Sequence, residues 1–364
     1  MSFGVFSRPG EVPRVGYRRG DRVLDLSGLD DLFAASSLNP FMAQGPAAWH
    51  DALGRIDGVD DAGIPLEDVR LHLPFEVADY VDFYSSIEHA TNVGRLFRPD
   101  GEPLLPNWRS LPIGYHGRSG TIVVSGTEVV RPCGQSRPRG TDGPVYGPSR
   151  RLDVELELAF VVGVPSELGT PLPVSAFPDH VFGVLLVNDW SARDIQAWEY
   201  QPLGPFLGKS FATSISSWVT PLAELDAARV RGPAQDPEPF PYLRHDDPWN
   251  LDLDLKIELN GTVVSRTNSR SLYWSFAQQF AHLTSNGASV RTGDLCASGT
   301  ISGSERGSEG SLLELTRNGL EPLRLADGST RTFLEDGDEV VLRGRAGELE
   351  LGEVRGRILP AQCE

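Results

Sequence analysis

The chain has 364 residues, of which 40% are hydrophobic and 23% are charged, as in a globular protein with a large core. Its net charge of −17 argues against a nucleic acid or an anionic membrane as partner, because both require basic patches. No apolar run approaches the ~20 residues of a membrane helix, and no signal peptide is visible, so the sequence predicts a cytoplasmic protein.

The three cysteines are Cys133, Cys296 and Cys363. No two of them have the spacing of a zinc knuckle, and they are too few and too scattered for a disulfide framework. The sequence therefore predicts three reduced thiols.

The first 70 residues predict a small β-rich domain with a short helix near residues 47–53. The rest of the chain alternates strand-like runs with Gly and Pro turns, which favours a large mixed or antiparallel sheet assembly over βαβ units. The expected strands cover residues 121–124, 152–162, 181–188, 251–259, 311–315 and 339–342. The three main expected helices cover residues 85–97, 192–200 and 271–286.

Four acidic residues occupy positions that suggest a common site. Glu155 and Glu157 share one face of an expected strand, with Cα atoms ~7 Å apart. Asp189 follows a buried apolar run, and Asp82 lies at a similar junction between a strand and a helix. A solvated sheet surface is an alternative explanation for the glutamates, and helix capping is one for the aspartates.

If the four carboxylates converge, their repulsion has to be relieved. Two carboxylates ~6 Å apart repel by ~3 kcal/mol at an effective dielectric of about 20, and the pairs among four exceed ~10 kcal/mol. That sum is comparable with the stability of a whole domain. A cation or protonation would relieve it, and oxygen ligands favour Ca²⁺ or Mg²⁺ over zinc.

The helix expected at residues 192–200 places Arg193, Gln196 and Tyr200 on one face. A polar stripe of this kind often only faces solvent. Because the helix directly follows Asp189, we interpret the stripe as part of the same site.

His89 lies in the helix expected at residues 85–97, where a structural and a catalytic role are both open. Glu314 is a candidate partner, because a carboxylate among leucines in an expected strand is unfavourable unless it is paired. Such a pair would orient the histidine as a general base.

Lys209 is one of only two lysines in the chain, the other being Lys256. It follows a glycine-rich run that resembles a phosphate loop, but Gly204 and Gly208 are one residue too close for that motif. Nucleotide binding is therefore disfavoured. Codon bias explains the scarcity of lysine equally well, but we interpret Lys209 as an electrophilic group near the acidic site.

Six runs in this chain resemble the fumarylacetoacetate hydrolase family. In chain order they are DFYSSIEHATNVG (82–94), LPNW (105–108), GYHGR (114–118), NDWSARDIQ (188–196), GPFLGKS (204–210) and ASGTISG (297–303). The likeness extends in order from about residue 69 to 360 and is therefore specific. The first 70 residues are similar only loosely.

This resemblance implies a homodimeric hydrolase that cleaves a carbon–carbon bond of the diketo acid 4-fumarylacetoacetate, giving fumarate and acetoacetate in the last step of tyrosine and phenylalanine catabolism. It implies a mainly β fold with some α. A small SH3-like N-terminal barrel, residues 1–70, would precede a large mixed β-sandwich roll, residues 71–364.

The resemblance also implies a role for each matching residue. The ligands of Ca²⁺ would be Asp82, Glu155, Glu157 and Asp189. A second cation, Mg²⁺, would lie by Asp189, Lys209 and Thr213. Water would be activated by His89 and Glu314. The developing oxyanion would be stabilised by Arg193, Gln196 and Lys209. The substrate would be held by Tyr84, Arg98, Tyr115, Tyr200 and Thr300.

Two rival hypotheses remain. One is a relative in the same superfamily, such as an acylpyruvate hydrolase or an isomerase or decarboxylase of catechol breakdown, which would share the carboxylate site but not the runs around His89 and residues 114–118. The other is a non-catalytic β protein stabilised by Ca²⁺. That hypothesis leaves His89, Lys209 and the polar face of the helix at residues 192–200 unexplained.

Overall fold

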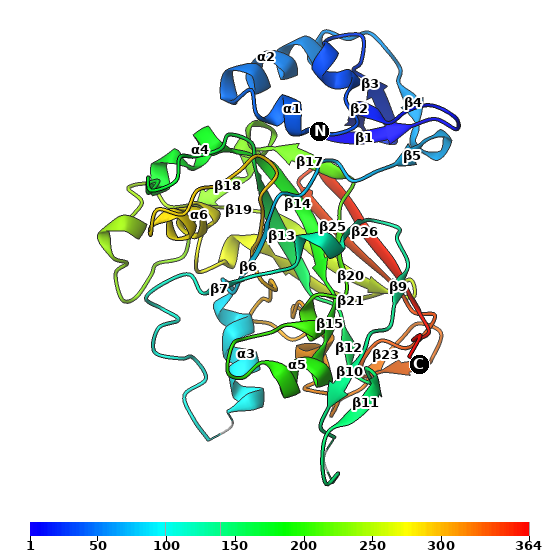
Figure 1. Ribbon diagram of the computed structural model, residues 1–364, viewed down its shortest axis with the longest axis vertical. Coiled ribbons are helices and arrows are strands. Elements are labelled where there is room, and N and C mark those ends of the chain that lie inside the picture. Colours follow the sequence, from blue (N-terminus) through cyan, green and yellow to red (C-terminus); the bar gives the residue numbers. More distant parts are fainter. Residues whose placement is uncertain (99, 139, 364) are drawn as a thin grey trace.

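The computed structural model describes residues 1–98, 100–138 and 140–363. The chain is mainly β with some α, and its N-terminal elements lie at one end of a larger body formed by the rest (Figure 1). Among the residues described, no helix is long and apolar enough to cross a bilayer.

The N-terminal elements form an antiparallel sheet, in the order β4-β3-β2-β1, with short helices beside it. Their bounds are β1 (Ser2–Ser7), β2 (Arg14–Arg19), β3 (Arg22–Asp25), α1 (Asn39–Met42), α2 (Pro46–Asp57), β4 (Ile64–Pro65) and β5 (Arg70–Leu71). The short helix expected near residues 47–53 is thus confirmed as part of α2.

The N-terminal strands do not form a separate sheet. β1 pairs with β17 (Trp218–Pro221), where Phe3 faces Val219, so the N-terminal sheet continues into the central sheet of the larger body. The two parts also share a core, in which Phe3 and Trp49 pack against Phe182 with ring centroids 5.7 and 5.3 Å apart. The SH3-like form of this unit and its boundary at residue 70 remain predictions.

The central sheet continues from β17 in the order β14-β13-β22-β6-β7. Its strands are β6 (Tyr80–Phe83), β7 (Gly114–His116), β13 (Leu156–Val162), β14 (Val181–Asp189) and β22 (Leu295–Ala297), with β8 (Ile122–Val124) and β16 (Thr213–Ile215) attached through β14. β13 and β14 are buried along their whole lengths, because the sheet has packed structure on both faces. Pairs β22/β6 and β16/β8 are parallel and the rest antiparallel, so the expected mixed sheet is confirmed.

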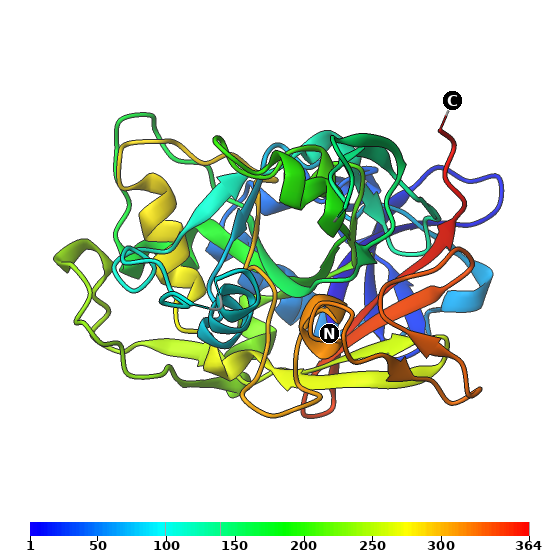
Figure 2. The ribbon, with the colours of Figure 1, turned by 90° about the horizontal axis from the view of Figure 1, so that it is seen from below.

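A second sheet, in the order β21-β20-β25-β26-β9, packs against the first. Its strands are β9 (Val129–Val130), β20 (Asp254–Leu259), β21 (Thr262–Asn268), β25 (Glu339–Ala346) and β26 (Leu349–Leu359). Figure 2 shows the sheets curving around the middle of the larger body. Leu158, Phe160 and Leu186 of the first sheet share a core with Leu255, Ile257 and Leu342 of the second.

The remaining strands form two-stranded sheets. They are β10 (Cys133–Ser136) with β11 (Val145–Pro148), β12 (Leu152–Asp153) with β15 (Ser191–Ala192), β18 (Arg229–Arg231) with β19 (Trp249–Leu251), and β23 (Leu323–Arg324) with β24 (Thr330–Arg331). The strand expected over residues 152–162 is therefore interrupted, because β12 ends before Glu155 and β13 begins after it.

The three main helices are confirmed. The first two are slightly shorter than expected, and the third covers nine of the sixteen expected residues. They are α3 (Ile87–Phe97), α5 (Arg193–Glu199) and α6 (Phe276–Thr284), with the short α4 (Phe177–His180) beside α6. α6 begins late because Ser275 and Gln278 form a reciprocal capping box. The strand expected at residues 311–315 is wrong. This segment is the helix α7 (Leu312–Leu315), which Ser311 caps.

The prediction of three reduced thiols is also wrong. Cys133 and Cys363 form a disulfide, with their Cα atoms 5.9 Å apart, and only Cys296 is free among the cysteines. The two half-cystines are 230 residues apart in the sequence, and the fold brings the C-terminal segment beside β10. A spacing rule that considers only nearby cysteines cannot detect such a pair.

Candidate active site

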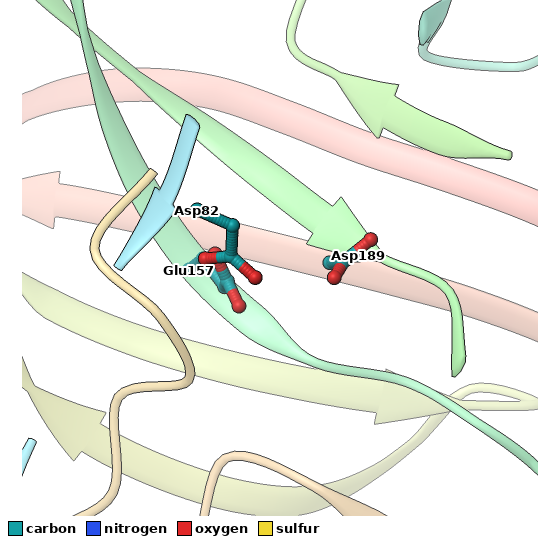
Figure 3. Close-up of side chains that lie close together, drawn as sticks. All are labelled: Asp82, Glu157 and Asp189. Carbon is teal, nitrogen blue, oxygen red and sulfur yellow. The ribbon is translucent and has the colours of Figure 1, made fainter. Parts of the chain in front are cut away.

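Three acidic side chains from three strands of the central sheet meet at one point. Asp82 lies on β6, Glu157 on β13 and Asp189 at the end of β14, and all three are buried (Figure 3). One carboxylate oxygen of each lies within 4.8 Å of the others. A single cation could therefore contact all three.

The register of the sheet explains why these residues meet. Ala297 of β22 lies opposite Asp82 on one side and Ala159 on the other, so only a methyl group separates β6 from β13 on this face. Glu157, two residues before Ala159, projects from the same face. Its partner on β14 is Val187, and Asp189 follows two residues later, again on that face.

The structure excludes the two alternative explanations for these acidic residues, a solvated sheet surface and helix capping. Glu157 and Asp189 are fully buried, and Asp82 is 3% exposed. The helix that follows Asp82 is capped by Ser86, and the residue at the cap of α5 is Ala192. The buried carboxylates therefore need another explanation.

The oxygens of this group are not satisfied by the protein. Within the described part of the chain, Asp82 Oδ1 and both Glu157 carboxylate oxygens have no hydrogen-bond partner. Burial and the neighbouring carboxylates raise the pKa of Asp82 and the pKa of Glu157 well above their ordinary values. A buried, unpartnered carboxylate is unfavourable unless a proton or a cation neutralises it. An all-oxygen donor set fits a hard divalent cation.

Glu155, the fourth expected ligand, lies beside this group but contacts cationic side chains. One of its oxygens accepts a hydrogen bond from Lys209 Nζ, and the other is 2.7 Å from a terminal nitrogen of Arg193. Burial acts to raise the pKa of Glu155, but Arg193 and Lys209 outweigh it and hold that pKa below the ordinary value. Glu155 is therefore an anion that is already neutralised by protein groups.

Lys209 connects Glu155 with Asp189. Its ammonium also donates to Asp189 Oδ2 at 2.6 Å, and the two carboxylates raise the pKa of Lys209 despite its burial. Asp189 accepts further hydrogen bonds from Thr213 Oγ1 and Tyr115 Oη, both at 3.2 Å. The structure thus brings together Asp189, Lys209 and Thr213, the set expected beside a second cation.

The expected histidine–glutamate pair is formed. His89 Nδ1 lies 2.6 Å from Glu314 Oε2, and both residues are buried. His89 is the third residue of α3, and its amide donates to the capping Oγ of Ser86. Glu314 occupies the equivalent position of α7, where Ser311 is the cap. Each member of the pair is therefore held in the first turn of a short, capped helix.

The remaining hydrogen bonds of Glu314 fix its charge and its orientation. Asn92 donates to Oε1 at 3.0 Å, Ser302 Oγ lies 3.0 Å from both oxygens, and Ser311 Oγ donates to Oε2 at 2.8 Å. Burial acts against ionisation, but His89 and these donors outweigh it and keep the pKa of Glu314 below its ordinary value. An ionised Glu314 keeps the proton of His89 on Nδ1 and leaves Nε2 as the basic nitrogen.

Backbone pairing places the histidine–glutamate pair beside the acidic group. Glu155 forms an isolated β-bridge with Ser311, the residue that caps α7. The neighbouring amide of Leu156 donates to Gly310 O at 2.9 Å. Tyr84, two residues after Asp82, packs edge-on against the His89 ring at a centroid distance of 5.3 Å.

Arg193 and Gln196 lie on the same side of α5, as expected. Arg193 is buried, and one of its terminal nitrogens donates to Gln196 Oε1 at 3.4 Å. The pKa of Arg193 is raised, because Glu155 and Asp153 outweigh the effect of burial. The arginine is thus a permanent cation that is held by carboxylates.

The residues expected to hold a substrate fall into two groups. Thr300 is buried with its hydroxyl unpartnered in the described part of the chain, and Tyr84 and Tyr115 lie beside His89 and Asp189 as given above. Arg98 and Tyr200 are exposed and make local contacts. Arg98 donates to the carbonyl of Pro103 at 2.6 Å, and the Tyr200 hydroxyl accepts from Gln201 at 3.0 Å.

Sequence reasoning missed four polar groups of the site. They are Asn92, Asp153, Ser302 and Ser311. Ser311 carries a detectable signal, because Ser-x-x-Glu at residues 311–314 is the pattern that begins a helix. For Asp153 the alternation with Glu155 and Glu157 was the only hint.

Comparison with known proteins agrees with this geometry. Residues 80–359 match the sequence model described as fumarylacetoacetate (FAA) hydrolase C-terminal, and residues 1–74 match that of fumarylacetoacetase N-terminal. The chain is 45% identical over 399 aligned residues to the fumarylacetoacetases of Rattus norvegicus and Homo sapiens, covering 99% of this chain and 95% of each relative.

Solved structures share the fold at lower identity. A fumarylacetoacetate hydrolase from Exiguobacterium antarcticum aligns with a TM-score of 0.60 at 17% identity, covering all of both chains. A maleylpyruvate hydrolase from Sphingobium sp. SYK-6, solved with manganese(II) and pyruvate, aligns with a TM-score of 0.58 at 18% identity, again covering both chains fully.

Proposed function

Because the chain belongs to the fumarylacetoacetate hydrolase family, we propose that it hydrolyses 4-fumarylacetoacetate to fumarate and acetoacetate, the last step of tyrosine and phenylalanine catabolism. The observation that carries this proposal is the histidine–glutamate pair next to a buried, partly unsatisfied group of carboxylates. The 45% identity over nearly the full length of known fumarylacetoacetases supports the same substrate.

The carboxylates would anchor the substrate through a metal ion. Asp82, Glu157 and Asp189 would hold a hard divalent cation, and Glu155 would join them by turning from Lys209 and Arg193. A β-diketone would chelate such an ion through its two oxygens, and the bound ion would polarise the carbonyl that is attacked. We assign Ca²⁺ to this site, because four carboxylates and a wide oxygen set suit the larger ion.

A second, smaller cation would lie beside Asp189, Lys209 and Thr213. Lys209 and Thr213 both donate hydrogen bonds to Asp189, which supports a shared site. Mg²⁺ is our assignment, because it needs few protein ligands and retains its waters. Metal analysis of the purified protein, followed by titration of the metal-free protein with each ion, distinguishes Ca²⁺, Mg²⁺ and Mn²⁺.

His89 acts as the general base. Its Nε2, the ring nitrogen that does not face Glu314, accepts a proton from water, and Glu314 stabilises the imidazolium that forms. The hydroxide adds to the carbonyl carbon of the fumaryl group and gives an alkoxide. The carbon–carbon bond then breaks, fumarate forms, and acetoacetate leaves as an enolate that takes the proton back.

Both anions need donors that are already in place. Arg193 and Lys209 are buried and Gln196 is half-buried, so their N–H groups lie where such donors are effective. Tyr84, Tyr115 and Thr300 surround the same region. Arg98 and Tyr200 would turn inward from the surface to hold the carboxylate ends of the substrate.

The decisive experiment measures acetoacetate release. Purified protein is given fumarylacetoacetate or a series of acylpyruvates, with and without chelator. Release from fumarylacetoacetate that chelator abolishes supports the proposal. A preference for acylpyruvates would instead favour the related hydrolases, and chelator-sensitive stability without any turnover would favour a Ca²⁺-stabilised binding protein.

We also propose a homodimer. Leu203, Phe206 and Leu207, next to α5, are 98%, 69% and 49% exposed, and apolar surface of this kind is often covered by a partner. Light scattering on the purified protein measures the mass in solution. A monomer at micromolar concentration would contradict the proposal.

The proposed location is the cytoplasm, as expected of an enzyme of amino-acid breakdown. Disulfides are rare in that compartment. The proposal therefore requires Cys133 and Cys363 to be mainly reduced in the cell, although they are placed to form a bond. Alkylation of thiols at the moment of lysis, followed by mass spectrometry, measures the fraction that is reduced.

A further inference from the structure

Asp153 is buried between the two halves of the site and accepts four hydrogen bonds. Oδ1 accepts from the amides of Val154 at 2.8 Å and Leu312 at 2.7 Å. Oδ2 accepts from Arg193 Nε at 2.8 Å and from the amide of Leu313 at 3.0 Å. No part of this side chain is exposed to solvent.

One set of these bonds holds the helix that carries Glu314. Leu312 and Leu313 are the first two residues of α7, and their amides lack partners within the helix. Asp153 accepts from both, while Ser311 accepts from the third amide, that of Glu314 itself. All three free amides at the start of α7 are thereby satisfied, and the position of Glu314 relative to His89 is fixed.

The remaining hydrogen bond of the Asp153 carboxylate holds Arg193, the proposed oxyanion donor. Arg193 Nε donates to Asp153, while Nη1 donates to Gln196 Oε1 and Nη2 lies 2.7 Å from Glu155 Oε1 as an ion pair. The backbone of Asp153 is also paired with Ser191, immediately before α5. The carboxylate therefore sets both the position and the rotation of the guanidinium plane.

We propose that Asp153 is a positioning residue that couples the water-activating pair to Arg193. Asp153 contacts neither substrate nor metal and acts only through α7 and α5. This inference rests on the proposed function. A misplacement of about 1 Å at a catalytic group lowers turnover by about 10²-fold. The loss of Asp153 should therefore lower kcat and leave KM nearly unchanged.

The test is D153N, which keeps the shape of the side chain but replaces an acceptor oxygen by an NH₂ group facing an N–H donor. We expect kcat for fumarylacetoacetate to fall by about 10²-fold and KM to change by less than about 2-fold. The metal-induced rise in melting temperature should persist, because the metal ligands are intact. Unchanged kcat, or a loss confined to KM, would overturn the proposal.

A double-mutant cycle separates positioning from general destabilisation. If Asp153 acts through α7, D153N should cost little further activity in an E314Q background, and the two losses should not multiply. Losses that multiply fully would show that Asp153 does not act through Glu314. Inactivity of the unmodified protein toward fumarylacetoacetate would instead reject the proposed function, so the two failures are distinguishable.

The matched control is D338N. Asp338 is also buried, is paired with Arg331 Nε at 2.9 Å and accepts from the amide of Glu335 at 2.7 Å, but none of its partners belongs to the site. D338N should lower stability and leave kcat unchanged. If D153N does not fold, D153S is measured by the same criteria. Failure of both Asp153 variants to fold, while D338N folds, would assign Asp153 a purely structural role and overturn the proposal.

Discussion

His89 Nδ1 and Glu314 Oε2 lie 2.6 Å apart although the residues are separated by 225 positions in the sequence. Each residue is held by a serine that caps its own helix, Ser86 for α3 and Ser311 for α7. The geometry of the pair is thus determined by two helix starts, which are rigid, and not by mobile loops.

Replacement of His89, the proposed general base, should strongly reduce turnover. We expect H89A to lower kcat by about 10²–10⁴-fold, because water then has no positioned proton acceptor. The rate of acetoacetate release measures this loss. H180A is the control, because His180 Nδ1 donates to Val164 O at 2.9 Å, away from the site. Near-normal turnover in H89A would exclude His89 as the base.

Neutralising the Glu157 carboxylate should affect the stability of the protein differently with and without bound metal. The Glu157 oxygens are buried and have no protein partner within the described residues, so E157Q removes an uncompensated charge. We expect metal-free E157Q to be as stable as the metal-free parent or more stable, by up to about 2 kcal/mol, and to lose most of the stabilisation by Ca²⁺.

Thermal denaturation with chelator and with excess Ca²⁺ measures both effects. E258Q is the control, because Glu258 pairs with Lys256 at a distance of 2.6 Å on the second sheet. It should retain the full shift on adding Ca²⁺. A shift in E157Q equal to that of the parent would contradict the metal site.

Glu314 should make stability depend on pH in the acidic range. The pKa of Glu314 is lowered from 4.5, because His89 and the neighbouring donors outweigh the effect of burial. Its folded state therefore binds the proton less readily than the unfolded state. The resulting stabilisation is fully present above about pH 4.5 and is lost as the pH falls through the lowered pKa.

E314Q has no such titration. The difference in unfolding free energy between the parent protein and E314Q should therefore narrow as the pH falls below about 4.5. Urea denaturation at several pH values from about 3 to about 6 measures it. A difference that stays constant over this range would show that Glu314 is not held as an anion.

The disulfide should contribute to stability and not to catalysis. Cys133 and Cys363 close a loop of most of the chain, so reduction should lower the free energy of unfolding by about 2–4 kcal/mol. C363S should be as stable as the reduced parent and should not respond to reductant. Both proteins should keep normal kcat, and a response of C363S to reductant would contradict this assignment.

The sequence was sufficient to predict the helices and strands that have strong periodic patterns. The buried strand before Asp189 was predicted from its apolar run, and the helix that carries Arg193 was predicted from the spacing of its polar residues, although no side chain caps that helix. The sequence did not identify α7, because three leucines and one glutamate over four residues fit a short strand as well as one helical turn. Only the Ser-x-x-Glu pattern separates the two.

The arrangement of the carboxylates depends on long-range pairing. That Asp82, Glu157 and Asp189 meet depends on the order β14-β13-β22-β6, which local patterns do not encode. The alternation along residues 153–157 did not reveal that Glu155 faces Arg193 and Lys209, because the strand is interrupted at that point. The resemblance supplied this convergence as an expectation, with no statement of which charges compensate one another.

The junction of β1 with β17 has a consequence for how the chain can be divided. Phe182, which the N-terminal aromatic rings cover, is on β14, the same strand that ends in Asp189. Cutting away residues 1–74 would uncover this ring and leave the edge of β17 unpaired, a template for aggregation. The larger body therefore needs the N-terminal residues and should not be expressed without them. For a variant that is cleaved or fused near residue 75, solubility should be measured before activity.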